Sequence, residues 1–75
     1  MTSDTEISPQ ARMANDIAVQ FTHKSAREAA GAIANHIKMF WDPRMKSELD
    51  QILDDNPQDL HPLAREAAQK LRDSR

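Results

Sequence analysis

The feature that most constrains this chain is how little of it could form a β-sheet. Its 75 residues include one Gly, one Val and no Tyr, and no Asn-Gly or Asp-Gly pair of the kind that closes a tight hairpin. Ala, Leu, Met, Gln, Glu, Lys and Arg dominate instead, and these residues favour helices. We therefore predict an all-α fold, a small bundle of three to four short helices.

Prolines and capping residues indicate where the helices begin. In Ser8-Pro9 and Asp42-Pro43, the side chain of the first residue can accept a hydrogen bond from a free backbone amide of the helix. The proline that follows has a backbone angle suited to the first turn. Ser25 is followed three residues later by an acid, which is the spacing of a capping box. Pro62 opens the last helix. We expect these helices to end near residues 21–22, just before 42, near 54–55 and near 72.

The chain is short enough to be one domain at most. We expect a flexible N-terminal tail over residues 1–7, a helical domain over 8–72 and a polar tail over 73–75. The chain has no Cys, so neither disulfides nor Cys-ligated zinc can compensate for a small core. Its stability must then come from an unusually tight helical core or from a partner.

Apolar residues recur at helical spacing in all four predicted helices. Gly31 falls within the second of them, where a glycine costs about 1 kcal/mol relative to alanine. Either it fits closely against another helix of the same chain, or a partner's helix lies there. The residues that we expect to face inward are Met13, Ala14, Ile17, Ala18, Phe21, Ala26, Ala30, Ile33, Ile37, Phe40, Met45, Leu49, Ile52, Leu53, Leu63, Ala64, Ala67, Ala68 and Leu71.

Few residues of this chain could carry out catalysis. A single Gly rules out both a dinucleotide-binding loop and a phosphate-binding loop, and there is no Cys nucleophile. His23, His36 and His61 lie in three different segments, so no two of them have the spacing of a helical metal-ligand pair. The stretch DDNPQD lacks the Gly and terminal Glu of a calcium loop. We predict a non-catalytic chain without a cofactor or metal ion of its own.

Charge is distributed unevenly along the sequence. The net charge is −2, which is unfavourable for binding nucleic acid. Residues 23–46 carry a balance of +3, whereas residues 48–59 hold five acids and no base. Each run is either a solvated face or a docking surface for a partner of opposite charge. No segment is apolar enough to span a membrane, and the start MTSDTEISPQ does not resemble a secretory signal, so we expect a soluble cytoplasmic protein.

The segment FWDPRM, residues 40–45, concentrates residue types that are common in protein interfaces. It holds two of the three aromatic residues, an Arg and a Met, with a second Met just before it. Trp41 could fill the corner between the second and third helices, or it could contact a partner. Both roles are compatible, since a tryptophan can pack inward while its indole N–H faces a partner.

Two strings in the sequence resemble one family. RMAN-x-IA, which starts at Arg12, and HI-x-x-FWDPRM, which ends at Met45, are together similar to the delta subunit of NAD-dependent formate dehydrogenase. The stretch Leu60-x-Pro62-Leu63 is similar to the C-terminal part of the same family, so the resemblance covers about residues 11–71. An aromatic pair is frequent in the family where this chain has Phe21-Thr22.

The resemblance implies an accessory role in a large enzyme complex. It implies an alpha subunit with a bis-pterin molybdenum or tungsten cofactor and iron–sulfur clusters. A beta subunit would hold FMN and the NAD site, with a gamma subunit in some complexes. The delta subunit would dock on alpha and support assembly, cofactor insertion or stability. We expect the docking face to include Arg12, Asn15, Phe40, Trp41, Asp42, Pro43, Arg44 and Met45.

Three alternatives to a permanent subunit remain open. The chain could be a maturation chaperone that binds the immature alpha subunit and leaves the finished enzyme. It could be a small DNA-binding helical domain, although Gly31 falls within a predicted helix and not in the turn of a helix-turn-helix motif. The least favoured alternative is an enzyme that acts alone.

Overall fold

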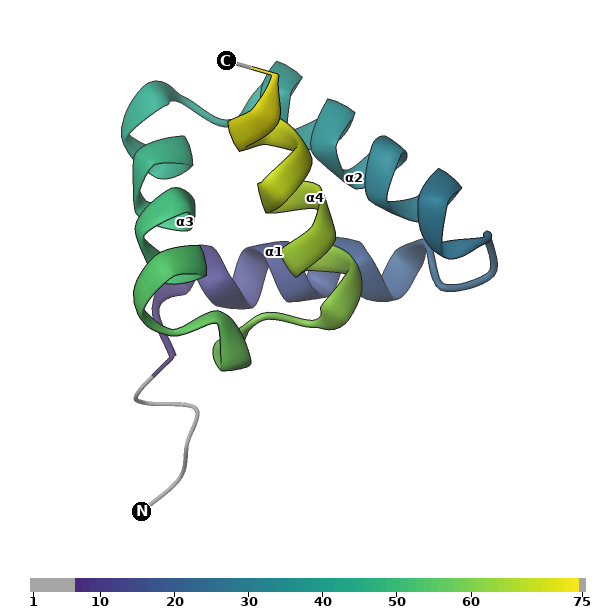
Figure 1. Ribbon diagram of the computed structural model, residues 1–75, viewed down its shortest axis with the longest axis horizontal. Helices are drawn as coiled ribbons and strands as arrows, with labels where there is room; N and C mark the ends of the chain where they lie inside the picture. Colours follow the sequence, from purple (N-terminus) through teal and green to yellow (C-terminus); the bar gives the residue numbers. More distant parts are fainter. Residues whose placement is uncertain (1–6, 75) are drawn as a thin grey trace.

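The computed structural model describes residues 7–74, which form four α-helices (Figure 1). These are α1 (Pro9–Gln20), α2 (Ala26–Phe40), α3 (Pro43–Asp55) and α4 (Pro62–Asp73). A short 3₁₀-helix, η2 (Pro57–Asp59), lies between α3 and α4. No β-strand occurs among residues 7–74. The prediction of a small all-α bundle is confirmed.

Side-chain caps fix the helix starts. Oγ of Ser8 accepts a hydrogen bond from the backbone N–H of Ala11 at 3.2 Å, and Oγ of Ser25 accepts from that of Glu28 at 3.3 Å. Oδ1 of Asp42 accepts from the N–H of Met45 at 2.8 Å. Each bond satisfies an amide that the helix itself leaves without an acceptor. The predicted caps at these three starts are therefore confirmed.

The fourth helix has a cap that the sequence did not reveal to us. Nδ1 of His61 accepts a hydrogen bond from the backbone N–H of Leu63 at 3.1 Å, just before the first turn of α4. Histidine is not among the preferred capping residues. Its position immediately before Pro62, which is the first residue of the helix, was the signal that could have suggested this role.

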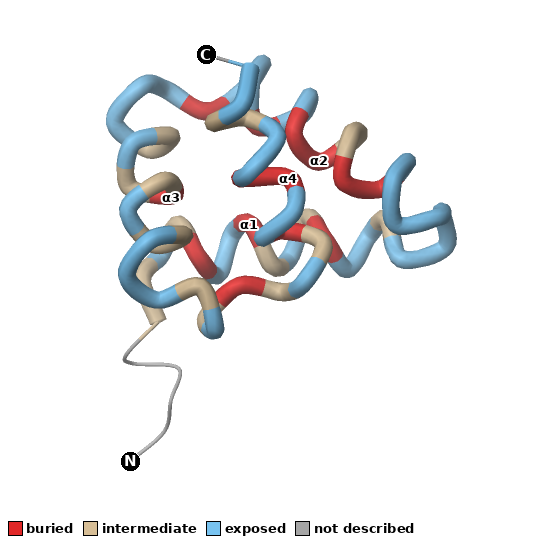
Figure 2. The backbone as a smooth tube through the Cα atoms, in the orientation of Figure 1, coloured by how far each residue is buried: buried red, intermediate tan, exposed pale blue. Residues whose placement is uncertain are grey.

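The core lies where the four helices face one another. The most extensive packing is between α2 and α4, while α1 crosses beneath them and contacts all three other helices (Figure 1). Nine of the fourteen buried hydrophobic residues within residues 7–74 are alanines. Alanines bring helix backbones close together, and five larger side chains fill the remaining space, namely Ile33, Ile37, Trp41, Leu49 and Leu60. The outer turns of the helices remain exposed (Figure 2).

Three of the residues that we expected to face inward do not. Met13 is 41% exposed, because the buried stripe of α1 is formed by alanines and Met13 lies about 100° around the helix from Ala14. Phe40 is 71% exposed, because the next residue, Trp41, occupies the core at this corner. Ala26 is exposed because the first turn of α2 extends beyond the packed region (Figure 2).

Ile7 lies at the edge of the described residues. We had assigned it to the N-terminal tail, yet it is partly buried and packs against the core. The rest of that predicted tail, residues 1–6, lies outside the described residues, as does Arg75. At the other end, α4 extends to Asp73, the first residue of the predicted C-terminal tail.

An ion-pair network joins α3 to α4. The Arg72 guanidinium donates through Nε to Oδ1 of Asp50 at 2.7 Å and through Nη2 to the backbone carbonyl of Asp50 at 3.0 Å. Nη2 also lies 2.8 Å from Oδ1 of Asp54. Hydrogen bonds to Asp50 and then to Asp54 raise the pKa of Arg72 above its usual value, so the guanidinium stays charged. Two of the acids of α3 are thus already paired with a basic side chain of α4.

Two further observations bear on the interpretations made from the sequence. No atom outside the local backbone lies within 4 Å of the position that a Cβ on Gly31 would occupy, so this glycine does not permit a close approach of another helix of the same chain. None of the helices within residues 7–74 is both long enough and apolar enough to cross a membrane.

Candidate docking surface

Residues 40–45 form the corner at which the chain leaves α2 and enters α3. The backbone N–H of Trp41 donates to the carbonyl of Ile37 at 2.9 Å and closes α2. The extended backbone of Trp41 and Asp42 then turns the chain, and Pro43 begins α3. Met45 packs against the core from the first turn of α3. Several residues of the segment therefore build the corner itself.

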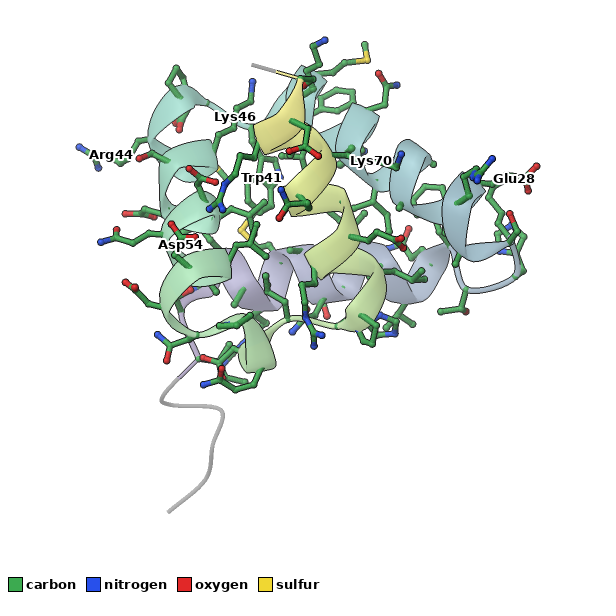
Figure 3. The ribbon with its side chains drawn as sticks, in the orientation of Figure 1. Glu28, Trp41, Arg44, Lys46, Asp54 and Lys70 are labelled. Atoms are coloured by element: carbon green, nitrogen blue, oxygen red, sulfur yellow. The ribbon has the colours of Figure 1, made fainter. Side chains whose placement is uncertain are left out.

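Trp41 anchors this corner. Only 6% of it is exposed, and it belongs to the core cluster (Figure 3). Within residues 7–74, the indole N–H has no hydrogen-bond partner. Every buried side-chain polar atom in the same part of the chain does have a partner, so this N–H is not one of the buried atoms. The N–H therefore reaches the protein surface. The structure shows the corner-filling role and leaves one polar atom of Trp41 accessible.

Phe40 and Met39 form an exposed apolar pair on the last turn of α2. Phe40 is 71% exposed and Met39 is 67% exposed. The Phe40 ring contacts the ring of His36 one turn earlier, with 4.8 Å between centroids and 39° between planes. Nδ2 of Asn35 lies 3.7 Å from the sulfur of Met39. Both side chains are thus held by neighbours on α2 and uncovered on their outer side.

Arg44 lies on the outer side of the first turn of α3. Its side chain points away from the bundle (Figure 3). It has no hydrogen bond or ion pair with any other residue of the described segment 7–74. Asp42 and Pro43 beside it are also exposed, although the Asp42 carboxylate is engaged in capping α3. Arg44 is therefore the basic group of the corner that is available to a partner.

Asn15, from the other matched string, has an internal role. Nδ2 of Asn15 donates to the backbone carbonyl of Asp59 at 2.9 Å, and Oδ1 accepts from the backbone N–H of His61 at 2.7 Å. The side chain thereby fixes the segment that leads into α4 against α1. Arg12 is exposed one turn earlier on α1.

The eight predicted docking residues do not form one continuous surface. The corner lies at the top of the view in Figure 1, whereas α1 crosses the lower half. At the corner, Phe40 and Arg44 are exposed, while Trp41, Asp42, Pro43 and Met45 shape the backbone and core that position them. We use the name corner surface for the exposed Met39, Phe40 and Arg44.

The described residues do not gather a metal-binding cluster. Among residues 7–74, no group of three or more His, Cys, Asp or Glu side chains is arranged to hold a metal ion. The acids of α3 and the following loop are spread along the surface, and two of them contact Arg72.

A family comparison decides the identity of the chain. The profile of the family described as NADH-dependent formate dehydrogenase delta subunit, FdsD, matches residues 11–68. The chain belongs to the FdsD family. The matched region of this FdsD chain runs from α1 into α4 and contains both strings on which we based the resemblance. A search of curated proteins and a search of solved structures each found no match.

Proposed function

We propose that this chain is a permanent, non-catalytic subunit that docks on the large alpha subunit of formate dehydrogenase. There it would support assembly, cofactor insertion or stability of the complex. The observation that carries the proposal is the FdsD match over residues 11–68, because a delta subunit acts together with other subunits. Beta, and gamma where present, would complete the assembly.

The corner surface supports this role. An aromatic residue and a methionine are exposed on the last turn of α2, an arginine is exposed on the first turn of α3, and such residues are enriched in protein interfaces. Trp41 and the Asp42 cap fix the backbone between Phe40 and Arg44. A surface held in this way loses less conformational entropy when it binds.

The chemistry of the complex would then belong to its other subunits. We propose that alpha holds the bis-pterin molybdenum or tungsten cofactor and the iron–sulfur clusters, and that beta holds FMN and binds NAD. This chain has no Cys thiolate to ligate an iron–sulfur cluster and only one Gly, which is too few for a glycine-rich phosphate loop.

The test is to purify the tagged chain from its native host and to measure which subunits and metals accompany it. We expect alpha and beta in a fixed ratio to this chain, with molybdenum or tungsten present and formate-dependent NAD reduction retained. Recovery of metal-poor alpha alone would instead identify a maturation chaperone. Absence of both subunits would contradict the proposal.

Variants locate the docking surface within the same experiment. We expect Phe40→Ser and Arg44→Glu each to reduce the recovery of alpha severalfold, because interface aromatic and arginine residues carry much of the binding energy. The matched controls are Val19→Ser, an apolar residue of α1 that is 59% exposed, and Arg27→Glu. Arg27 and Arg44 are both the second residue of a helix, so both reversals change the helix-dipole interaction equally. Equal losses in variants and controls would exclude the corner surface.

A further inference from the structure

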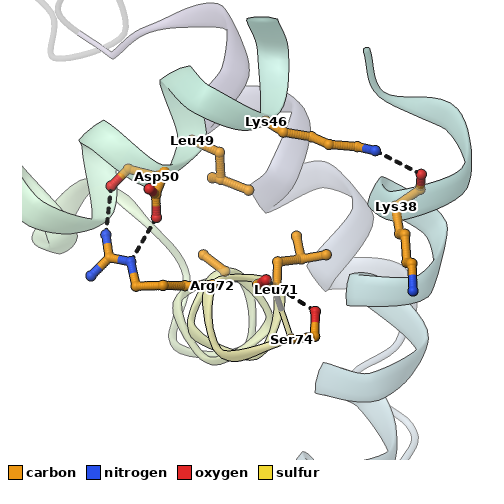
Figure 4. A pocket seen from close by; sticks show the side chains of 8 residues that line it. Lys38, Lys46, Leu49, Asp50, Leu71, Arg72 and Ser74 are labelled. Atoms are coloured by element: carbon orange, nitrogen blue, oxygen red, sulfur yellow. Dashed lines mark hydrogen bonds and ion pairs between the residues drawn. The ribbon is translucent and has the colours of Figure 1, made fainter. Parts of the chain in front are cut away.

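A cavity lies between the last turn of α2, the first half of α3 and the end of α4. Its volume is about 220 Å³, and its floor is formed by the partly buried Leu71, with Leu49 and Ala68 almost fully buried beside it (Figure 4). Lys38 from α2 and Lys46 from α3 stand at its rim, and the Asp50–Arg72 pair closes the opposite side. Ser74 lies at the end of α4 beside the opening. We call this feature the rim cavity.

The size of the rim cavity indicates what it could hold. Small-molecule and cofactor sites usually measure about 300–1,000 Å³. At about 220 Å³, the rim cavity is smaller than that range, and it opens to solvent between three helices. Its dimensions suit one large apolar side chain of a partner, inserted as an anchor against Leu71.

The charges at the rim indicate what should surround that anchor. Arg72 is neutralised by Asp50 and Asp54. Nζ of Lys46 donates to the backbone carbonyl of Lys38 at 2.9 Å, an acceptor that carries no formal charge. Within residues 7–74, neither lysine has a carboxylate within ion-pair distance. The rim therefore keeps two positive charges that no residue of the described chain neutralises.

We infer that the rim cavity binds an acidic amphipathic segment of the alpha subunit. That segment inserts one large apolar side chain against Leu71 and places carboxylates against Lys38 and Lys46. The inference rests on the proposed docking to alpha and adds the chemistry of the partner segment. The apolar floor and the uncompensated lysines together select this partner, since a basic or uncharged segment would leave the rim charges without a counterpart.

Charge reversal at the rim tests the inference. The full-length chain is titrated onto immobilised formate dehydrogenase complex from which delta has been removed, and the dissociation constant is measured at low and high salt. We expect Lys38→Glu with Lys46→Glu to weaken binding about tenfold or more at low salt, because like charges then face each other. We expect the control pair, Lys24→Glu with Arg27→Glu, to change binding by less than about threefold, since both residues are exposed away from the cavity.

A conservative pair separates charge from folding. Lys46→Gln retains a donor for the Lys38 carbonyl, and Lys38→Gln leaves the side-chain length similar. We expect the double glutamine variant to bind with intermediate affinity and to lose most of the salt dependence of the original chain. If it bound as tightly as the original chain at every salt concentration, the carboxylate contacts would be excluded.

Photo-crosslinking identifies the occupant directly. A photoreactive amino acid at Ser74, which is exposed at the cavity opening, should crosslink to a segment of alpha in which acids flank a large apolar residue. Crosslinks only between copies of this chain, or to a basic segment, would overturn the inference. If the original chain did not bind the delta-free complex at all, the proposed function would fail and the inference with it. If it bound and the rim reversals had no effect, only the rim cavity assignment would fail.

Discussion

The two strings that link this chain to the FdsD family have different roles in the structure. In RMAN, Asn15 is committed to two hydrogen bonds that hold the start of α4 against α1. FWDPRM combines internal and exposed residues, with Trp41 buried between the exposed Phe40 and the capping Asp42. The first string joins distant parts of the fold, and the second builds a corner that also presents a surface.

The comparison shows why a motif should not be read as one site. Asn15, Trp41 and Asp42 are explained by contacts within the chain, whereas Arg44 makes no hydrogen bond or ion pair within residues 7–74 and Phe40 stays 71% exposed beside His36 of its own helix. Loss of function after a substitution in the first group would report on folding. Substitutions in the second group should affect docking with little change in stability.

Trp41→Ala and Phe40→Ala should differ most in stability, although the residues are adjacent. Truncating a buried tryptophan costs about 3–5 kcal/mol, because it removes apolar contact and leaves a cavity. Trp41 is 6% exposed and Phe40 is 71% exposed, so we expect Phe40→Ala to stay within about 0.5 kcal/mol of the original chain. Urea denaturation followed by circular dichroism measures both. A loss at Phe40 as large as that at Trp41 would show that Phe40 is part of the core.

Asn15→Ala should have the next largest effect. It removes the side-chain amide and leaves the N–H of His61 without its acceptor and the carbonyl of Asp59 without its donor, which costs about 1–3 kcal/mol in a partly buried site. Asn35→Ala is the matched control, since Asn35 is exposed and makes only a weak contact to the Met39 sulfur. Thermal unfolding of the two variants gives the comparison. Equal stability would mean that the Asn15 bonds contribute nothing net.

Asp42 permits a test that separates its cap from its charge. Asp42→Ala removes the acceptor for the N–H of Met45, and loss of such a cap costs about 1 kcal/mol. Asp42→Asn keeps an acceptor and removes the charge, so we expect stability close to that of the original chain. Binding to the delta-free complex is then measured for Asp42→Asn. Unchanged binding would show that Asp42 acts only in the fold. Weakened binding would show that its charge contributes to docking.

Most of the fold could be predicted from the sequence, because helix starts depend on local interactions. Ser8, Ser25 and Asp42 cap their helices through bonds to residues three positions later, which spacing alone reveals. Periodicity was less informative where two apolar residues compete for one core position. Phe40 continues the apolar stripe of α2, but Trp41 fills the corner, and only the packing of four helices decides between them.

The candidate site was harder to predict because it depends on contacts between distant segments. The bonds from Asn15 cross 44 and 46 positions in the chain, and no local pattern indicates them. The rim cavity likewise combines Lys38, Leu49 and Leu71 from three helices. In the sequence, its two lysines are part of a basic run. That run does not indicate that they lie beside apolar side chains of two other helices.

Gly31→Ala should have the smallest effect on stability, and in the opposite direction. A glycine inside a helix is less favourable than alanine by about 1 kcal/mol, and a Cβ at this position would meet no atom within 4 Å. We therefore expect the variant to be more stable by up to about 1 kcal/mol, as measured by urea denaturation. A lower stability would contradict the open space around Gly31.

The same variant also tests the second interpretation of Gly31, that a partner's helix lies there, because packing within the chain does not account for this glycine. If Gly31→Ala is more stable but binds the delta-free complex more weakly, a partner helix approaches α2 at this glycine. If binding is unchanged, the partner contacts remain confined to the corner surface and the rim cavity.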